Sequence, residues 1–381
     1  MASKRNRKVI AIPYNINPIW MGGVIYILNT IKILNWLEDS EKPIVRLFYR
    51  KELKRFVSEI NYPYLEAVET KYPEIKIGYI GSWLSKRNKF IESIVQNDTD
   101  AVFPLQDYPV SFKKYPGVKL VSWYADLQHK YHPNFFTKRK ILEREARIKL
   151  MLKNTDHLVL SSNAVRSDFE KFYGLKQIKT HIYHFASVID SFDFSDWEQV
   201  RKEKGLPGEY FMVSNQFHKH KNHKAVLEAL SILKAKGVTP VVAFTGRMPN
   251  IDQSEYIRNL YFLIEKHKLE KQVVFLGVLS RHEQLTLMRY AKAVIQPSLF
   301  EGWSTVIEDA ISLQTPVIAS NLIVNQEQLG SLAPYFDPND PEELASLMEN
   351  QSQRKSNDTV IYEPYDTRIK NTAKSFLSIF A

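Results

Sequence analysis

The chain of 381 residues contains no cysteine. Disulfide bonds, thiolate metal sites and a thiol nucleophile are therefore excluded. No run of about 18 or more apolar residues occurs, so we expect no transmembrane helix. The apolar stretch 9–12, behind a basic N-terminus, is too short for the core of a secretory signal. These absences predict a cytoplasmic protein, either free or bound peripherally at the inner face of the cell membrane.

Positive charge is concentrated in the first half of the chain. Residues 1–200 carry 31 Lys and Arg against 22 Asp and Glu, whereas residues 201–381 carry 21 against 20. A basic face attracts phosphates, anionic lipid head groups or nucleic acid. Any single cluster, such as Lys138-Arg139-Lys140, is also explained as a solvated surface. No nucleic-acid-binding motif accompanies the charge, so we expect no nucleic-acid partner.

Short apolar segments alternate with amphipathic helical segments along the whole chain. The expected strands are 9–12, 44–48, 101–104, 119–123, 157–160, 210–214, 241–245, 273–276, 293–296 and 316–319. Continuously apolar strands are typical of parallel sheets that are buried on both faces. The alternation therefore predicts an α/β fold made of two Rossmann-like, doubly wound parallel-sheet domains that face each other across a cleft.

A polar stretch with Gly205, Pro207 and Gly208 separates the two halves. We place the first domain at 1–195 and the second at 205–364. The final helix, 365–381, is apolar on one face and is expected to pack back on the first domain. In open parallel sheets, ligands bind outside the carboxyl ends of the strands, so the residues that follow strands are the candidates for a site.

The segment 296–310 combines a strand end, a loop and a helix start. Glu301 lies in the loop and the helix begins near Thr305. Thr305 and Glu308 have the spacing of a capping box, so we interpret Glu308 as a cap. The free amides and the positive end of the helix dipole suit a diphosphate. Because helical side chains lean toward the N-terminus, Asp309 is expected to reach the same pocket.

This segment resembles the signature of the GT-B glycosyltransferases of family GT4, in which a second Glu follows the first by eight positions. The resemblance implies that Glu301 contacts the donor sugar and that Asp309, in place of the second Glu, contacts the nucleotide ribose. If the register shifts by one residue, Glu308 takes that role. The remaining donor-binding residues expected in this segment are Gly302, Trp303, Ser304 and Thr305.

A second stretch, 213–223, also resembles the family, which has an Arg here and a Lys five residues later to hold the diphosphate. Lys221 matches the Lys, but Gln216 stands at the position of the Arg. Nearby His and Lys side chains are expected to compensate. Asn215 and Gly246 complete the donor-binding residues. The histidine spacing is not typical of a zinc site, so we expect no metal and no cofactor beyond the co-substrate.

Two loops of the first half are acceptor-side candidates. Gly22 and Gly23 lie between a strand and a helix, where they line the cleft or form an ordinary turn. Asp126, Gln128 and His129 follow the strand 119–123 and resemble an Asp-x-Gln-His stretch of polysaccharide-assembling members. The resemblance implies that His129 or Asp126 faces the acceptor or the transferred sugar. A loop that is merely hydrogen-bonded on the sheet is the alternative.

The resemblance implies a retaining hexosyl- or deoxyhexosyltransferase. Its donor is a nucleoside-diphosphate sugar, and its acceptor is a hydroxyl of a glycan or lipid-linked oligosaccharide in bacterial surface polysaccharide synthesis. A nucleotide-sugar epimerase of the same fold is one alternative, and a non-catalytic protein that binds nucleotide sugars or glycans is another. The nucleotide base, the sugar, the linkage and the oligomeric state do not follow from the sequence.

Overall fold

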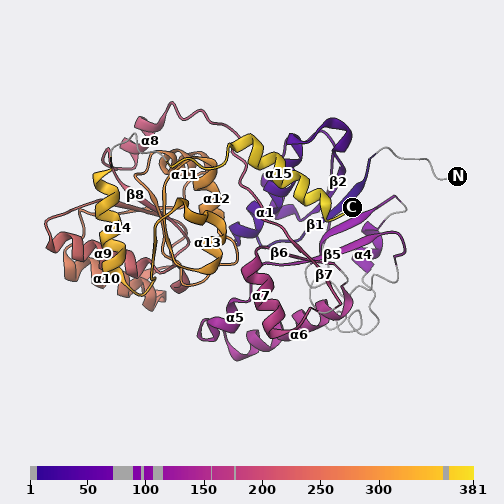
Figure 1. Ribbon diagram of the computed structural model, residues 1–381, viewed down its shortest axis with the longest axis horizontal. Helices are drawn as coiled ribbons and strands as arrows, with labels where there is room; N and C mark the ends of the chain where they lie inside the picture. Colours follow the sequence, from indigo (N-terminus) through magenta and orange to yellow (C-terminus); the bar gives the residue numbers. More distant parts are fainter. Residues whose placement is uncertain are drawn as a thin grey trace. The chain divides into compact units, whose positions relative to one another are not determined.

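The computed structural model divides into two units (Figure 1). Unit 1 comprises Met1–Val188 together with Pro364–Ala381, and unit 2 comprises Ile189–Glu363. The described residues are 7–71, 89–95, 98–105, 115–155, 157–175, 177–354 and 360–381. Unit 2 therefore includes residues 189–195, which we expected in the first domain, and residues 196–204, which we expected between the two domains.

Unit 1 contains a parallel sheet of seven strands in the order β3-β2-β1-β4-β5-β6-β7. Its strands are β1 (Val9–Tyr14), β2 (Ile44–Tyr49), β3 (Leu65–Glu69), β4 (Ala101–Leu105), β5 (Lys119–Tyr124), β6 (His157–Leu160) and β7 (Lys179–Ile182). Its α-helices are α1 (Met21–Lys32), α2 (Lys54–Val57), α4 (Lys89–Ile94), α5 (Gln128–Tyr131), α6 (Lys138–Asn154), α7 (Asn163–Phe172) and α15 (Tyr365–Ser378). The strand order reverses between β1 and β4, which makes this the switch point of the sheet.

Helix α15 packs on unit 1 although it ends the chain (Figure 1). The ring centroid of Phe376 lies 5.4 Å from that of Phe103 and 5.4 Å from that of Tyr183. The indole nitrogen of Trp36 donates to the Asp366 carboxylate at 2.8 Å. The apolar face expected for this helix is thus buried on the sheet of unit 1.

Unit 2 contains a parallel sheet of six strands in the order β10-β9-β8-β11-β12-β13. Its strands are β8 (Phe211–Ser214), β9 (Val242–Thr245), β10 (Val273–Gly277), β11 (Val294–Gln296), β12 (Val317–Ser320) and β13 (Tyr335–Phe336). Its α-helices are α8 (Trp197–Glu203), α9 (His223–Ala235), α10 (Glu255–His267), α11 (Arg281–Arg289), α12 (Thr305–Ser312), α13 (Ile323–Leu329) and α14 (Pro341–Gln353). In this sheet the order reverses between β8 and β11.

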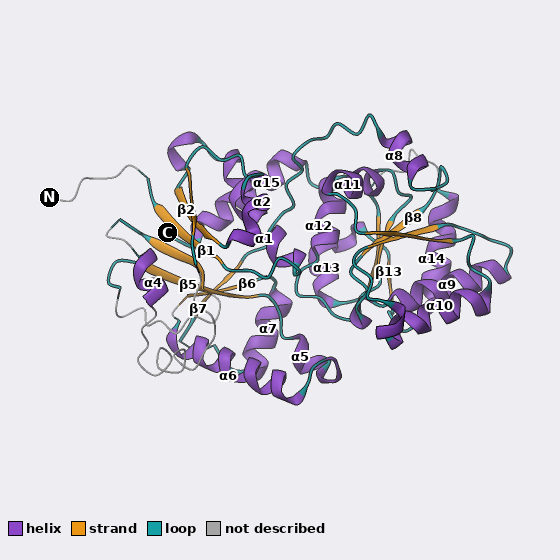
Figure 2. Cartoon of the chain, turned by 180° about the vertical axis from the view of Figure 1, so that it is seen from behind, coloured by secondary structure: helices purple, strands orange, loops and turns teal. Residues whose placement is uncertain are grey.

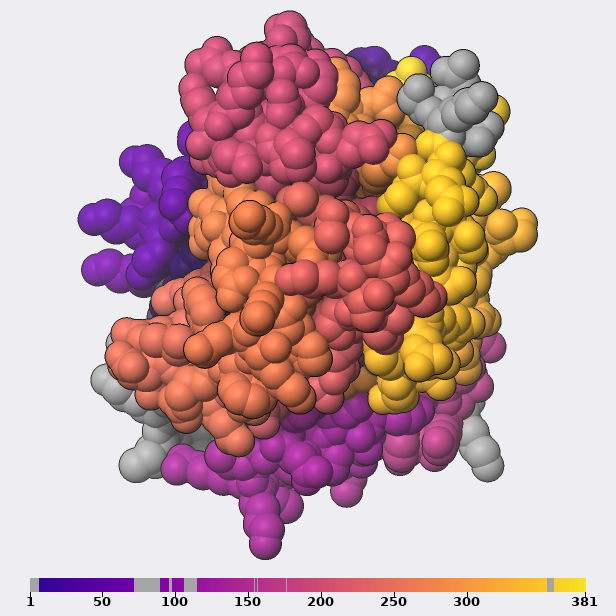
Figure 3. Space-filling view, turned by 90° about the vertical axis from the view of Figure 1, so that its left-hand side faces the viewer, coloured from indigo at the N-terminus to yellow at the C-terminus, as the bar shows by residue number. Residues whose placement is uncertain are grey.

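Helices cover both faces of the sheet in unit 2 (Figure 2). Apolar side chains of α9, α10 and α14, among them Leu230, Ile257 and Leu344, are buried in one core with the strands. Figure 3 shows this side of unit 2 from outside, with α14 in yellow. Two parallel sheets with helices on their faces confirm the expected doubly wound α/β class.

Some local expectations were wrong. Helix α1 begins at Met21, so it includes the two glycines that we expected between a strand and a helix, and it continues as a 3-10 helix, Ile33–Trp36. Strand β3 was missed because four of its five residues are exposed at the edge of the sheet, so it lacks a continuous apolar run. Within the described ranges, no helix is both long and apolar enough to span a bilayer.

Candidate functional site

A buried polar network lies at the switch point of unit 2. Asn215 follows β8 and Gln296 ends β11, and the Asn215 amide donates to Gln296 Oε1 at 3.0 Å. Both side chains are buried. Buried amides need hydrogen-bond partners, and this pair joins the two strands at the edge where sheets of this class bind ligands.

Glu301 extends this network toward a cation. Its Oε1 atom accepts from Gln296 Nε2 at 2.7 Å and from Lys221 Nζ at 2.6 Å. Burial raises the pKa of Glu301, but the charge of Lys221 and hydrogen bonds from Lys221 and Ser298 outweigh it, and the pKa lies below its ordinary value of 4.5. The carboxylate is thus ionised. Its partner in the structure is Lys221, and the predicted contact with the donor sugar stays a prediction.

A loop-to-loop hydrogen bond holds Lys221 and Glu301 together. The Leu299 amide donates to the His220 carbonyl at 2.7 Å, so the two loops run side by side. Gln216 lies before this stretch, half-buried, with Oε1 3.1 Å from His218 Nε2. The structure therefore brings Lys221, Glu301, Asn215 and Gln296 into one network.

Helix α12 begins at Thr305, as predicted, but its cap differs. Ser304 is the N-cap, and its hydroxyl accepts from the Ile307 amide at 3.3 Å. Glu308 does not cap the helix, because it is fully buried and accepts from Gln328 Nε2 at 2.6 Å. Gly302 is buried and Trp303 half-buried before the cap. The capping-box interpretation was wrong by one residue, and Glu308 serves the packing between α12 and α13.

Asp309 is held by an arginine that the sequence analysis missed. Both of its carboxylate oxygens accept from Arg281, at 2.5 Å and 2.6 Å, and Asp309 is only 1% exposed. The side chain of Arg281 is 32% exposed. The sequence signal that could have identified Arg281 is a cation at the start of the helix that follows β10. The carboxylate of Asp309 is thus paired with Arg281, and its predicted contact with a ribose stays a prediction.

Arg281 also connects to the switch point. One of its guanidinium nitrogens lies 3.5 Å from Gln284 Oε1, and Gln284 Nε2 donates to Ser214 Oγ at 2.8 Å. Ser214 is the last residue of β8. Arg281 and Asp309 thus border the same strand end that Asn215 follows.

Gly246 supports the network from the neighbouring strand end. Its φ angle is +136°, and a Cβ atom there would lie 2.3 Å from the Asn215 carbonyl oxygen. A side chain would therefore displace Asn215. The structure gives Gly246 a packing role beneath Asn215.

His223 lies at the start of α9, next to this loop. Its ring stacks on Phe217 with centroids 4.2 Å apart, and Nδ1 lies 3.1 Å from the Tyr256 hydroxyl. Burial lowers the pKa of His223 from 6.5 to about 3. A hydrogen bond to the Asn215 backbone raises this pKa, but its effect is smaller than that of burial. His223 is neutral at physiological pH and is part of the core. In the described part of the chain, no group of three or more His, Asp or Glu residues is arranged to hold a metal ion.

The acceptor-side candidates lie in unit 1. Asp126 Oδ1 accepts from the Gln128 amide at 3.0 Å where α5 begins. His129 is 2% exposed, and its Nε2 lies 2.9 Å from Glu145 of α6. Burial lowers the pKa of His129, and the Glu145 hydrogen bond offsets this only in part. The three residues therefore share one turn, but the imidazole faces α6 and does not lie open to a substrate.

The glycine pair lies within a helix. Gly22 and Gly23 belong to the first turn of α1, directly after Trp20. A Cβ atom at Gly23 would lie 2.5 Å from the Trp20 ring, and one at Gly22 would lie 3.5 Å from it. The pair is thus helical and neither a loop nor a simple turn, and Gly23, not Gly22, makes room for the indole of Trp20.

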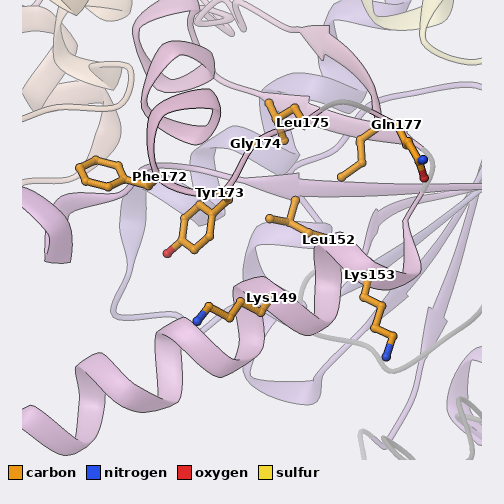
Figure 4. A pocket seen from close by; sticks show the side chains of 9 residues that line it. Lys149, Leu152, Lys153, Phe172, Tyr173, Gly174, Leu175 and Gln177 are labelled. Carbon is orange, nitrogen blue, oxygen red and sulfur yellow. The ribbon is translucent and has the colours of Figure 1, made fainter.

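A surface hollow in unit 1 contains none of the predicted site residues. Its walls come from the end of α6 and the segment after α7 (Figure 4). The lining side chains are Lys149, Leu152, Lys153, Phe172, Tyr173, Leu175, Gln177 and Ile178, with Gly174.

Comparison with known families identifies unit 2. Residues 196–364 match the family described as "Glycosyl transferases group 1". Residues 196–364 belong to the glycosyl transferases group 1 family. The match covers the Lys221–Glu301 network and the Arg281–Asp309 pair. The resemblance to GT4 is thereby confirmed.

Curated relatives of the chain include proteins named as mannosyltransferases. The chain is 25% identical over 228 residues to the O-antigen chain mannosyltransferase RfbU of Salmonella typhimurium, which is 60% of this chain and 59% of the relative. It is 24% identical over 157 residues to the serotype-specific mannosyltransferase WbdA of Escherichia coli, covering 40% of this chain and 18% of that protein. The matches therefore span only part of these relatives.

Solved glycosyltransferases share the whole fold. A glycosyltransferase from Rickettsia africae superposes with a TM-score of 0.67 and 16% identity, covering 99% of this chain and 96% of that one. Anabaena Alr3699/HepE, solved with UDP and glucose, gives a TM-score of 0.64 and 17% identity over 98% and 95%. With the two parallel sheets, this establishes the GT-B fold for the chain that carries the group 1 region.

Proposed function

We propose that the protein is a retaining glycosyltransferase that moves a hexose from a nucleoside-diphosphate sugar to a hydroxyl of a glycan acceptor. The observation that carries the proposal is the network of Asn215, Gln296, Glu301 and Lys221 at the switch point of a group 1 domain. It offers a cation for phosphate and a half-buried carboxylate for sugar hydroxyls within one hydrogen-bonded unit.

Lys221 is the group that meets the diphosphate. In the free protein it is neutralised by Glu301, with the two charged atoms 2.6 Å apart. A bound diphosphate competes for Lys221, and the amides at the start of α12 add partial positive charge. Glu301, partly released, accepts hydrogen bonds from the sugar hydroxyls. In this proposal no metal ion takes part, and that stays a prediction.

The transfer breaks the bond between the anomeric carbon and the phosphate oxygen and forms a bond to the acceptor oxygen on the same face. The acceptor proton goes to the departing phosphate. Lys221 stabilises the negative charge that grows on this leaving group, and fixed charges of this kind supply much of an enzyme's rate. In this proposal Asp309, which Arg281 holds, accepts hydrogen bonds from the ribose hydroxyls.

A hexose donor is favoured by the relatives named as mannosyltransferases and by the HepE structure solved with UDP and glucose. We extend the proposal to a lipid-linked oligosaccharide acceptor of bacterial surface polysaccharide, since the curated relatives are named for O-antigen chains. The nucleotide base stays open.

The test is a product assay with a panel of nucleoside-diphosphate hexoses, each with and without a lipid-linked glycan extract. We expect release of the nucleoside diphosphate that depends on the extract, together with an acceptor lengthened by one hexose. A changed nucleotide sugar without any acceptor would instead indicate an epimerase. Binding of the donor without turnover under every condition would favour the non-catalytic alternative.

We also propose that unit 1 binds an anionic membrane through the exposed face of α6. Arg139, Leu142, Lys149 and Lys153 recur at helical spacing on this face, and Leu142 is 70% exposed. Lys149 and Lys153 also border the hollow of Figure 4. Lysines and arginines around an exposed leucine are typical of a helix that lies in a membrane interface.

At low salt, wild-type protein is expected to sediment with vesicles that contain phosphatidylglycerol and much less with pure phosphatidylcholine. Replacing Arg139 and Lys149 by Glu should lower the bound fraction severalfold, since each basic residue contributes about 1 kcal/mol near an anionic surface. Lys266→Glu, an exposed position on α10 of unit 2, is the control. Equal sedimentation with both vesicle types would refute this proposal.

A further inference from the structure

An indole is presented at the switch point of the unit 1 sheet. Trp20 ends the loop that follows β1, beside the point where the strand order reverses. Trp20 is 44% exposed, and its neighbour Ile19 is 56% exposed. Ligands of open parallel sheets bind at this edge, and Trp20, like Asn215 in unit 2, follows the strand at which the order reverses.

Trp20 is part of a stack of three aromatic rings that runs from the core to the surface. Its ring lies nearly parallel to that of Trp123, with 9° between the planes and 5.9 Å between the centroids. Trp123 in turn stacks on Tyr26 at 4.1 Å and 6°. Trp123 and Tyr26 are each 2% exposed. Two buried rings thus hold the exposed one in a fixed orientation.

The first turn of α1 is shaped to receive this indole. The space that a Cβ atom of Gly23 would need is filled by Trp20, with three ring atoms within 2.9 Å of that point. Any larger residue at position 23 would push the ring away. The chain thus keeps a large aromatic ring 44% exposed at the surface and has no side chain at position 23, where that ring lies.

Hydrogen-bonding groups follow the same strand ends. Asp126 lies three residues beyond Trp123, in the turn that opens α5, and is half-buried. Asn15 follows β1, and its Oδ1 accepts from Arg50, which follows β2, at 3.3 Å. The segments after these strands thus carry a carboxylate, an amide and a guanidinium group, and a pyranose, whose ring has C–H groups on one face and hydroxyls on its rim, can use an aromatic face together with such groups.

We propose that Trp20 is the platform on which a sugar ring of the acceptor stacks, with Asp126 and Asn15 as the groups that meet its hydroxyls. This inference rests on the proposed function and adds the site and the chemical class of the acceptor. A preorganised ring loses little conformational freedom on binding, so it can contribute specificity at low entropic cost.

The test compares Trp20→Ala and Trp20→Phe with Ile19→Ala, the matched control on the same loop. In the transfer assay, Trp20→Ala should raise the acceptor KM about tenfold, the change expected for loss of one stacking contact, and Trp20→Phe should raise it less. The donor KM and the nucleotide-induced thermal shift should not change. Ile19→Ala should behave as wild type.

Saturation-transfer NMR with mannobiose and cellobiose tests the platform without catalysis. We expect signals on the ring C–H protons with wild type and Ile19→Ala, and their loss with Trp20→Ala. Equal effects of Trp20→Ala and Ile19→Ala on KM would indicate a surface for the acceptor's lipid and overturn the proposal. So would an unchanged acceptor KM, or no NMR signal with wild-type protein. Failure of the proposed function would appear separately, as no thermal shift with any nucleotide.

Discussion

Glu301→Gln is expected to lower the rate of sugar transfer by roughly 100-fold or more while the protein still binds nucleotide. Glu301 is a half-buried acceptor for Gln296 and Lys221, and its charge is stabilised by Lys221. Glutamine keeps the volume but removes the charge that organises the pair. Loss of one preorganised electrostatic group in an active site costs about 100- to 1000-fold in rate.

The nucleotide affinity of Glu301→Gln should be equal to or higher than that of wild type, because Lys221 no longer has a competing carboxylate. The measurement is transfer with labelled donor, alongside calorimetric binding of the nucleoside diphosphate. Glu308→Gln is the matched control, since Glu308 is a fully buried carboxylate in the first turn of α12 that accepts from Gln328 Nε2. Wild-type turnover by Glu301→Gln would remove this residue from the mechanism.

Arg281→Gln is expected to destabilise unit 2 by about 3–5 kcal/mol, the cost of leaving one member of a buried ion pair without its partner. Asp309 is 1% exposed, and Arg281 donates to both of its carboxylate oxygens. Because Arg281 itself is partly exposed, we expect a loss of stability near the lower end of this range. Urea unfolding followed by tryptophan fluorescence measures the change.

Two variants control this experiment. Arg281→Gln combined with Asp309→Asn replaces the ion pair by a neutral amide pair and should recover most of the lost stability. Lys204→Gln breaks an ion pair that joins the end of α8 to Glu283 of α11 at 2.6 Å, in which both side chains are partly exposed, and should cost less than about 1 kcal/mol. If Arg281→Gln were as mild as Lys204→Gln, the pair with Asp309 would not hold α11 and α12 together.

The sheets were predictable because their strands are continuous apolar runs, a pattern that depends little on the rest of the chain. The start of α12 was predictable for a similar local reason. Ser304 and Thr305 are both good caps, however, and local sequence does not choose between them. The choice follows from α13. Its Gln328 side chain donates to Glu308 and also accepts from the Ser304 amide at 3.2 Å.

The missed features all depend on residues that meet only in the folded chain. Arg281 and Asp309 are 28 residues apart, and their pairing requires α11 to lie beside α12. His129 was expected to be available to substrate, but Glu145 of α6, 16 residues later, covers it. We expected Lys221 to bind phosphate and Glu301 to bind sugar, but nothing in the sequence indicates that the two side chains form an ion pair with each other.

The central claim is that Lys221 and Glu301 form a donor site for a nucleoside-diphosphate sugar, and a thermal-shift screen tests it most directly. Wild-type protein and Lys221→Ala are each heated with UDP, GDP, dTDP, ADP and CMP. We predict that at least one nucleoside diphosphate raises the melting temperature of wild type by several degrees, as expected for a ligand at about 100 times its Kd, and that Lys221→Ala loses most of this shift. No shift with any nucleotide, or an equal shift in Lys221→Ala, would contradict the account.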